Sequence, residues 1–333
     1  MEKVAFIYGG TFVYWSSIVL TIAVIAAIAC FAGIYLWKSK NGMALSWTVP
    51  VAILLSMMIG RWVHWYCLTD SYESLAKAMT DYTWGGYALL GVFLGCTVTA
   101  VLTRAVCLHR NTAEMLDAMS IAGCAGIAVG RLASLFNSSD RGQVLENFRS
   151  LPFAYPVNNA VSGAVEYRLA TFFLQALVAL ALFIALAVFY RKGQKRGKLK
   201  DGDTCLIFLL IYGASQVVLD STRYDSLFFR SNGFVSVVQV LGALGLALAV
   251  IVFSRRMVKA RGMRAWMIFL WLAIAGLIGG AGYMEYYVQR RGNEALFAYS
   301  VMSACLLAIV CLTLVIRNLA VRVERRYHGA FDD

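Results

Sequence analysis

The sequence predicts an all-α integral membrane protein with about nine transmembrane helices, its N-terminus outside the cell and its C-terminus in the cytoplasm. Hydrophobic residues make up 60% of the 333 positions and charged residues only 14%. Soluble domains contain about 45–50% apolar and about 25% charged residues, so a soluble fold is excluded. The apolar residues are also gathered in long runs, and most Lys and Arg residues lie between the runs.

Nine apolar runs are long enough to form transmembrane helices, each of which needs about 20 apolar residues. The first run ends in Lys38 and Lys40, and because it is long we interpret it as a span and not as a cleaved signal peptide. The third and fourth runs are rich in glycine, which favours close helix packing because small residues let backbones approach. The runs fall near residues 14–37, 46–67, 84–103, 115–136, 168–190, 204–220, 235–254, 265–287 and 296–316. The glycines are Gly85, Gly86, Gly91, Gly95, Gly123, Gly126 and Gly130.

The unequal charge of the loops predicts the orientation. Nineteen Lys and Arg residues fall in one set of alternate loops and the C-terminal tail, and nine fall on the opposite side. The side richer in positive charge normally faces the cytoplasm. The net charge of +12 is therefore explained by topology. Nucleic-acid binding is disfavoured because the charges form short clusters between apolar runs.

The eight cysteines predict neither a metal site nor a disulfide framework. They form no CxxC pair, and most lie inside apolar segments. We interpret them as small packing residues in helices. No metal or other cofactor is expected.

The polar candidates lie in and around the longest outward-facing segment, residues 137–167. Long polar loops on a rigid scaffold are common sites of binding and catalysis. Several ionisable residues also fall at membrane depth, where they are costly and usually have partners. These residues are Arg61, His64, Arg131, Asp220 and Arg223. Arg61 and His64 lie one helical turn apart, and Asp220 is spaced to pair with Arg223.

Four arginines, Arg61, Arg131, Arg168 and Arg223, are candidates for lining one outward-facing cavity. Convergent guanidiniums suit a lipid phosphate because each offers planar, multi-donor recognition. Alternatively, each arginine extends to the lipid head groups or pairs with its nearest acid. His64 is either a general base, since imidazole titrates near neutral pH, or a hydrogen-bonded structural group.

The segment GRLASLFNSSDRG, residues 130–142, resembles the signature G-R-x-G-N-F-x-N-x-E-x-x-G of bacterial prolipoprotein diacylglyceryl transferases. Gly130, Arg131, Asn137 and Gly142 match it. Other segments resemble further family motifs in the same order, at residues 60–62, 84–86, 168–177, 211–223 and 235–242. The resemblance runs from about residue 13 to 256. It implies a seven-span transferase-like core over residues 1–256, followed by two additional transmembrane helices and a basic cytoplasmic tail over residues 257–333.

The signature itself departs from the family pattern at two positions. Ser134 replaces its first asparagine, and Ser139 replaces its glutamate. Asp140 and Glu146 are the candidates to substitute for that glutamate.

Other family positions are also changed. Leu90 occupies the position of the family histidine that follows the Gly-Gly turn, and Gln175 that of a glutamate. In the sixth span, Gln216 replaces an arginine and Asp220 a glutamate. The phosphate-facing part of the motif series survives, and much of the family's proton chemistry does not. The surviving residues are Arg131, Arg168, Tyr212 and Arg223.

The resemblance implies a transfer reaction at the bacterial plasma membrane. The lipobox cysteine thiol of a lipoprotein precursor, presented by its signal peptide, attacks the glycerol carbon of phosphatidylglycerol or another anionic phospholipid. A thioether forms and glycerol phosphate leaves. Arg131 and Arg223 would hold the phosphate, Asn137 would orient it, and Tyr212 would position lipid or thiol. His64 or Asp140 would serve as the base. The implied substrate-binding residues are Arg61, Ser134, Ser139, Gly142, Arg168, Gln216 and Asp220.

Two other functions stay open at this point. The missing histidine and glutamate favour a relative that binds phospholipid or a lipid-linked partner without transferring anything. A transferase that uses the same lipid donor and a different acceptor is also consistent with the altered loop. A transporter is disfavoured because the sequence shows no paired broken helices with charges near the midplane.

Overall fold

The computed structural model describes residues 4–80, 86–107, 111–137, 139–145, 153–158, 163–197, 199–229, 232–291 and 294–328. Among these residues, nine helices are long and apolar enough to cross a membrane, which confirms the predicted all-α, multi-pass class. They are α1 (Trp15–Ser39), α2 (Gly42–Cys67), α4 (Leu89–Val106), α5 (Thr112–Gly130), α6 (Thr171–Lys195), α7 (Asp203–Ser221), α8 (Val237–Arg261), α9 (Ala265–Arg291) and α10 (Ala295–His328).

Short elements connect these spans. Within the part of the chain that the structure describes, three antiparallel strand pairs are formed by β1 (Val4–Tyr8) with β2 (Thr11–Tyr14), β3 (Ala154–Asn158) with β4 (Val165–Leu169), and β5 (Phe228–Phe229) with β6 (Asn232–Ser236). The short helices are η1 (Thr69–Ser71), α3 (Leu75–Thr80) and η2 (Arg131–Leu135). The fifth apolar run, predicted from residue 168, therefore begins in a strand, and its helix begins at Thr171.

The chain divides into two compact units, which we describe separately. Unit 1 contains residues 1–205 and 222–238, and unit 2 contains residues 206–221 and 239–333. In unit 1, α1 and α6 pack on α5, and α2 packs on α4. In unit 2, α9 packs on α10. The two units are defined by how compactly the chain packs. The domain boundary predicted at residue 256 was based on resemblance to the family, and it stays a prediction.

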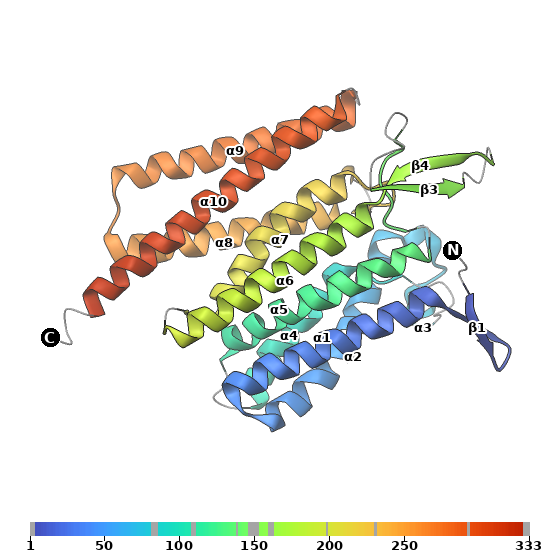
Figure 1. Ribbon diagram of the computed structural model, residues 1–333, viewed down its shortest axis with the longest axis horizontal. Helices are drawn as coiled ribbons and strands as arrows, with labels where there is room; N and C mark the ends of the chain where they lie inside the picture. Colours follow the sequence, from blue (N-terminus) through green and yellow to red (C-terminus); the bar gives the residue numbers. More distant parts are fainter. Residues whose placement is uncertain are drawn as a thin grey trace. The chain divides into compact units, whose positions relative to one another are not determined.

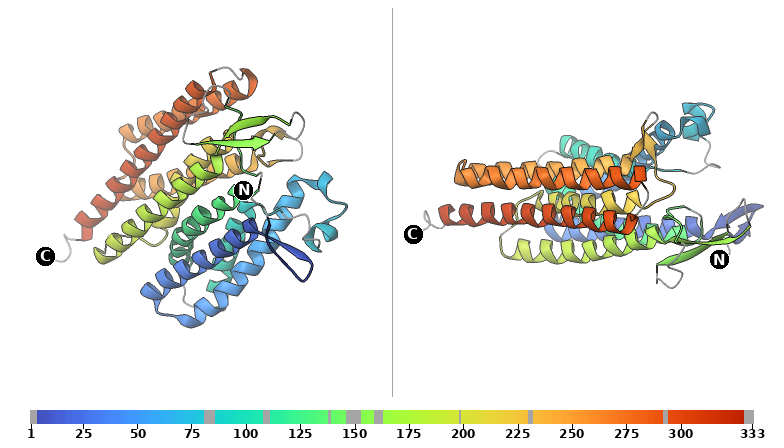
Figure 2. Two further views of the ribbon diagram at one scale, coloured as in Figure 1. Left: turned by 45° about the vertical axis from the view of Figure 1, so that its right-hand side comes forward. Right: turned by 90° about the horizontal axis from the view of Figure 1, so that it is seen from above.

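The short elements of unit 1 gather at one end of its helices. Figures 1 and 2 show the β1–β2 hairpin, α3 and the β3–β4 hairpin at this end. We call it the hairpin end. α5 leads into it through η2, and α6 begins there after β4. The polar segment after α5 is therefore held between the ends of two packed helices.

The opposite end of unit 1 carries the basic connections and is tied by polar contacts. Lys38 Nζ donates a hydrogen bond of 2.6 Å to Asp201 Oδ1. The buried Asp117 carboxylate accepts hydrogen bonds from the backbone N–H groups of Gly202 and Cys205, at 2.8 and 2.7 Å. These contacts fix the connection from α6 to α7 onto α5.

The predicted close packing of glycines holds for α4 and in part for α5. A Cβ atom on Gly91 would lie 2.3 Å from Gly60 Cα, and one on Gly95 would lie 2.6 Å from Ser56 Cα, so α2 and α4 touch along their backbones. A Cβ on Gly126 would lie 3.0 Å from Ala27 Cβ, whereas Gly123 faces nothing within 4 Å. Gly85, one of the glycines named above, lies outside the described residues.

Candidate functional site

The polar segment after α5 forms isolated β-bridges on both sides at the hairpin end. Residues 141–145 pair with β4 on one side, through hydrogen bonds from Gly142 N to Leu169 O (2.8 Å) and from Leu145 N to Tyr167 O (2.7 Å). On the other side they pair with residues 222–224, through hydrogen bonds from Gln143 N to Thr222 O (3.1 Å) and from Tyr224 N to Arg141 O (2.8 Å). This ladder brings the chain after α7 beside the chain after α5.

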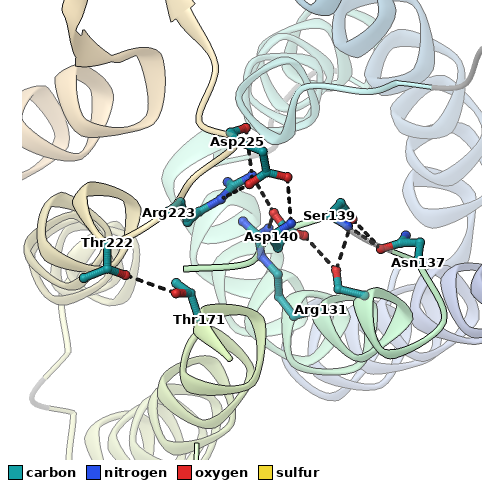
Figure 3. Close-up of polar contacts among 9 residues, drawn as sticks. Arg131, Asn137, Ser139, Asp140, Thr171, Thr222, Arg223 and Asp225 are labelled. Carbon is teal, nitrogen blue, oxygen red and sulfur yellow. Dashed lines mark hydrogen bonds and ion pairs between the residues drawn. The ribbon is translucent and has the colours of Figure 1, made fainter. Parts of the chain in front are cut away.

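Gly142 is required by this close pairing. A Cβ atom there would lie 2.7 Å from both Leu169 Cβ and Thr171 Oγ1. Thr171 and Thr222 are themselves buried, and their hydroxyls lie 3.1 Å apart, as Figure 3 shows. Gly142 therefore acts in packing, because no side chain fits between residues 141–145 and the segment from β4 to Thr171.

Asp140 is the centre of the polar cluster at this end. Its Oδ1 lies 2.7 Å from Arg131 Nη1 and 2.7 Å from Arg223 Nη2. Its Oδ2 accepts a hydrogen bond of 2.8 Å from Ser134 Oγ. Figure 3 shows the two arginines reaching this carboxylate from different elements. Two residues that lie 92 positions apart in the sequence are thus held on one carboxylate.

The backbone of Asp140 is also fully used. Its φ is +57°, a left-handed conformation that Asp tolerates better than most residues. Its N–H donates to Asp225 Oδ2 at 2.8 Å, and its carbonyl accepts from Phe172 N at 3.1 Å. Asp225 in turn accepts from Arg223 Nε and Nη2, at 3.2 and 3.0 Å.

The charges of this cluster balance: two guanidiniums face two carboxylates. Burial alone raises the pKa of Asp140, but the Arg131 and Arg223 guanidiniums and the Ser134 hydroxyl outweigh it and hold the pKa at about 2. Asp140 is therefore ionised at neutral pH and is a weak proton acceptor.

Two further residues of the signature extend the network. Asn137 Oδ1 accepts hydrogen bonds from the backbone N–H of Ser139, at 3.0 Å, and from its hydroxyl. Ser139 Oγ lies 3.5 Å from Ser134 Oγ. The structure thus brings together five of the predicted site residues, Arg131, Ser134, Asn137, Ser139 and Asp140, with Arg223 beside them (Figure 3). Glu146, the other candidate for the missing glutamate, lies outside the described residues.

Arg168 has a different set of contacts on β4. Its Nη2 lies 3.1 Å from Glu166 Oε2, and its guanidinium lies 4.6 Å from the ring centroid of Tyr224. Because Tyr224 is the residue after Arg223, Arg168 contacts the segment that contributes Arg223 to the cluster.

Arg61 and His64 lie on α2 with contacts of their own. Arg61 is buried, donates to the carbonyls of Ala78 (2.6 Å) and Gly86 (3.0 Å), and holds α3 and the start of the next segment onto α2. His64 Nδ1 lies 2.9 Å from the Tyr72 hydroxyl. A Cβ atom on Gly86 would lie 2.0 Å from His64 Nε2, so the imidazole lies directly against the Gly86 backbone.

Tyr212, Gln216 and Asp220 lie on α7 in unit 2, and all three are buried. Tyr212 stacks on Phe208, with ring centroids 5.1 Å apart. Their predicted roles in the site stay predictions.

Sequence reasoning missed one contributor to the cluster, Asp225, and gave no role to its neighbour Arg141. Asp225 follows Arg223 closely, and a carboxylate two residues from a predicted phosphate-binding arginine was a usable signal. Arg141 is buried, with its side chain on Tyr155 and its Nη2 on two backbone carbonyls. It occupies a position that the family signature leaves unspecified.

The fold and the site define a polytopic membrane protein with a buried arginine–carboxylate cluster at one end of its helices. A family model for prolipoprotein diacylglyceryl transferase matches residues 3–253, and the chain belongs to this family. It is 24% identical over 265 residues to the phosphatidylglycerol–prolipoprotein diacylglyceryl transferase of Streptococcus equi subsp. zooepidemicus (strain H70), a match that covers 78% of this chain and 97% of the relative.

A second relative supports the same assignment. The chain is 22% identical over 254 residues to the protein of the same name from Parasynechococcus marenigrum (strain WH8102), with 74% of this chain and 90% of that protein covered. The family match ends at residue 253, so α9 and α10 lie beyond it.

Proposed function

We propose that this chain is a phosphatidylglycerol-dependent prolipoprotein diacylglyceryl transferase of the bacterial plasma membrane. Its substrates are an anionic phospholipid, phosphatidylglycerol in the first place, and the signal peptide of a lipoprotein precursor. The observation that carries the proposal is the convergence of Arg131 and Arg223 on Asp140, both at 2.7 Å. This convergence assembles two cationic forks from distant parts of the chain at one point.

In the proposed reaction the precursor's thiolate sulfur attacks the glycerol carbon next to the phosphate. The new carbon–sulfur bond forms as the carbon–oxygen bond breaks, and the electron pair leaves on the phosphate oxygen. The thiol proton passes to a base, and glycerol phosphate departs. Arg131 and Arg223 place positive charge where the leaving group gains negative charge. Asn137 orients the phosphate from the same turn.

The properties of Asp140 suit positioning better than proton transfer. Its pKa of about 2 makes the carboxylate a weak base, because a good general base titrates near the working pH. Its two oxygens are engaged by Arg131, Arg223 and Ser134. We therefore assign Asp140 the role of aligning the two guanidiniums.

His64 is the better candidate base. The family histidine follows a Gly-Gly turn and falls here on Leu90, whereas the His64 ring lies against Gly86 of that same turn. If His64 Nδ1–H donates to the Tyr72 oxygen at 2.9 Å, Nε2 keeps the lone pair that accepts a proton. In the family, the histidine follows the Gly-Gly turn. Here His64, which lies on α2, contacts that same turn.

Ser134, Ser139, Gly142, Arg168 and Arg61 support the site in this proposal. The first two complete the hydrogen-bonded turn around Asp140, and Gly142 permits the tight ladder. Arg168 holds Tyr224 beside Arg223, and Arg61 holds the Gly86 turn against α2. Tyr212, Gln216 and Asp220 are proposed to contact the lipid or the thiol from α7.

One observation favours a second candidate, a relative that binds phospholipid without transferring it. The chain has Leu90, Gln175 and Ser139 where the family has a histidine and two glutamates. A binding protein needs the arginines and does not need these acid–base groups.

Complementation separates the two candidates. The chain is expressed in a bacterium depleted of its own diacylglyceryl transferase, and the lipobox cysteine of a reporter precursor is followed by mass spectrometry. We expect a diacylglyceryl mass with the native chain and none with Arg131→Ala. The matched control is Arg104→Ala, an exposed arginine near the opposite end of unit 1.

The outcomes of this experiment are distinct. If Arg131→Ala still transfers the diacylglyceryl group, the proposed role of the cluster is wrong. No transfer by the folded, membrane-inserted native chain, together with retained phosphatidylglycerol on purification, supports the binding protein. A diacylglyceryl mass on another protein indicates a different acceptor.

A further inference from the structure

Arg141 is a buried cation of the hairpin end that lies beside the cluster. Its side chain is 94% buried, which follows from an exposed fraction of 6%. Nη2 donates to the carbonyls of Ser134, at 3.2 Å, and Asn137. The other two nitrogens, Nε and Nη1, are shielded from solvent and have no hydrogen-bond partner in the described part of the chain. A buried guanidinium with two idle donors calls for an explanation, because such groups are normally satisfied.

Aromatic rings hold this guanidinium in one orientation. Its carbon lies 4.1 Å from the ring centroid of Tyr155 and 5.6 Å from that of Phe172. The two rings meet edge to face, with centroids 5.9 Å apart, and the Tyr155 hydroxyl donates to Leu135 O at 3.3 Å. The rings and the two carbonyls therefore fix the plane of the guanidinium before any ligand binds.

Arg141 also carries a charge that no carboxylate of the described residues balances. Arg131, Arg168 and Arg223 each lie within 3.1 Å of a carboxylate oxygen. Arg141 has no carboxylate partner among the described residues. An arginine stays protonated when it is buried, so the charge persists. A buried charge without a counter-ion is unfavourable, and an anion that reaches it gains the strong attraction of a low-dielectric site.

We propose that Arg141 binds a phosphate oxyanion through one of its two idle donors, Nε or Nη1, and is a specificity-determining residue of this chain's site. A hydrogen bond between a charged donor and a charged acceptor is roughly twice as strong as a neutral one, so an idle donor of Arg141 that meets a phosphate oxygen is stabilised. Arg141 and the cluster share Ser134, whose carbonyl accepts from Arg141 and whose hydroxyl donates to Asp140. The phosphate belongs to a phospholipid head group or to free glycerol phosphate. This inference deepens the proposed function and rests on it for the identity of the ligand.

A purely structural role is the competing explanation, since Nη2 holds the two carbonyls at the end of the η2 turn. The two roles predict opposite results for Arg141→Met, which keeps the length of the side chain and removes its charge. A structural arginine would lower the thermal stability of the ligand-free protein when it is replaced. An unneutralised cation would leave that stability unchanged or raise it, because its burial is unfavourable without the anion.

The experiment measures binding and is therefore independent of transfer. The full chain is reconstituted in phosphatidylcholine nanodiscs, and glycerol 1-phosphate is titrated while the unfolding temperature is followed at constant ionic strength. A second series replaces part of the phosphatidylcholine with phosphatidylglycerol. We expect Arg141→Met to bind at least about tenfold more weakly than the native chain in one of the two series. The series that responds identifies the source of the phosphate.

Two further variants keep the test decisive. Arg141→Lys keeps the charge but lacks the planar guanidinium that the rings hold in place, and we expect it to recover part of the affinity that Arg141→Met loses. Arg104→Met is the matched control and should bind like the native chain. Unchanged affinity of Arg141→Met in both series overturns the inference, whatever the complementation shows. Weak binding by Arg141→Met combined with absent transfer by the native chain upholds it and rejects the proposed transfer.

Discussion

At the scale of single residues, the site depends on where one carboxylate lies. The sequence places Ser139 at the family's glutamate and Asp140 one position later, and a shift of one residue normally turns a side chain to the other face of an extended segment. Asp140 has a left-handed φ of +57°, and its carboxylate contacts both Arg131 and Arg223. Asp140 is therefore a candidate to replace the family's glutamate, and this replacement stays a prediction.

The ion pairs of Asp140 predict a pH dependence of stability. The folded-state pKa of about 2 lies below the ordinary value of 3.8, so Asp140 stabilises the fold above pH 4 and this contribution is lost as the pH falls toward 2. A difference of this size corresponds to roughly 2 kcal/mol. We expect thermal unfolding in detergent to show this loss between pH 4 and 2.

Replacing Asp140 tests this assignment. Asp140→Asn leaves two buried guanidiniums without their shared carboxylate, and we expect it to lower the free energy of unfolding at pH 7 by about 3–5 kcal/mol. The variant should also flatten the acid limb of the stability curve. Asp70→Asn, which alters an exposed carboxylate of η1, is the matched control. An acid limb that is unchanged in Asp140→Asn would show that another group causes it.

At the scale of elements, the spans were predictable and the pairing of the polar segments was not. Each span is a local property, since about 20 consecutive apolar residues suffice to identify it. The ladder of residues 141–145 is not local, because its partners lie on β4 and after α7. The same distinction applies to the site. The motif arginines were identified from the sequence, whereas the joint contact of Arg131 and Arg223 with Asp140 required the ladder.

The contact between α2 and α4 predicts whether a glycine-to-alanine substitution raises or lowers the unfolding temperature. An alanine normally stabilises a helix interior relative to glycine by about 1 kcal/mol. At Gly91 its Cβ would lie 2.3 Å from Gly60 Cα, a backbone atom that cannot move aside alone. We therefore expect Gly91→Ala to lower the unfolding temperature.

Gly123→Ala is the control for this experiment. Gly123 lies in α5 and has nothing within 4 Å of the added Cβ, so its replacement should leave the unfolding temperature unchanged or raise it. Equal effects of the two substitutions would contradict the backbone contact between α2 and α4.

At the scale of the whole molecule, α9 and α10, which lie beyond the family match, are hydrogen-bonded to other helices of unit 2. Trp271 Nε1 on α9 donates to Ser254 Oγ on α8 at 3.1 Å, and the Tyr299 hydroxyl on α10 donates to Ser221 O at the end of α7 at 3.2 Å. α9 and α10 are thus bonded to helices that lie within the matched range. The resemblance to the family ended near residue 256 and carried no information on these contacts.

The orientation of the chain is the remaining prediction, and unit 1 alone can test it. The proposed reaction needs the hairpin end outside, where a precursor presents its lipobox cysteine. The charge distribution predicts the same, because the basic connections lie at the other end of unit 1. In a background without native cysteines, we expect Glu73→Cys, exposed at the hairpin end, to react with a membrane-impermeant maleimide on intact cells. Arg196→Cys, exposed at the opposite end, should react only after permeabilisation. The reverse pattern would place the arginine–carboxylate cluster in the cytoplasm and leave the proposed transferase without access to its acceptor.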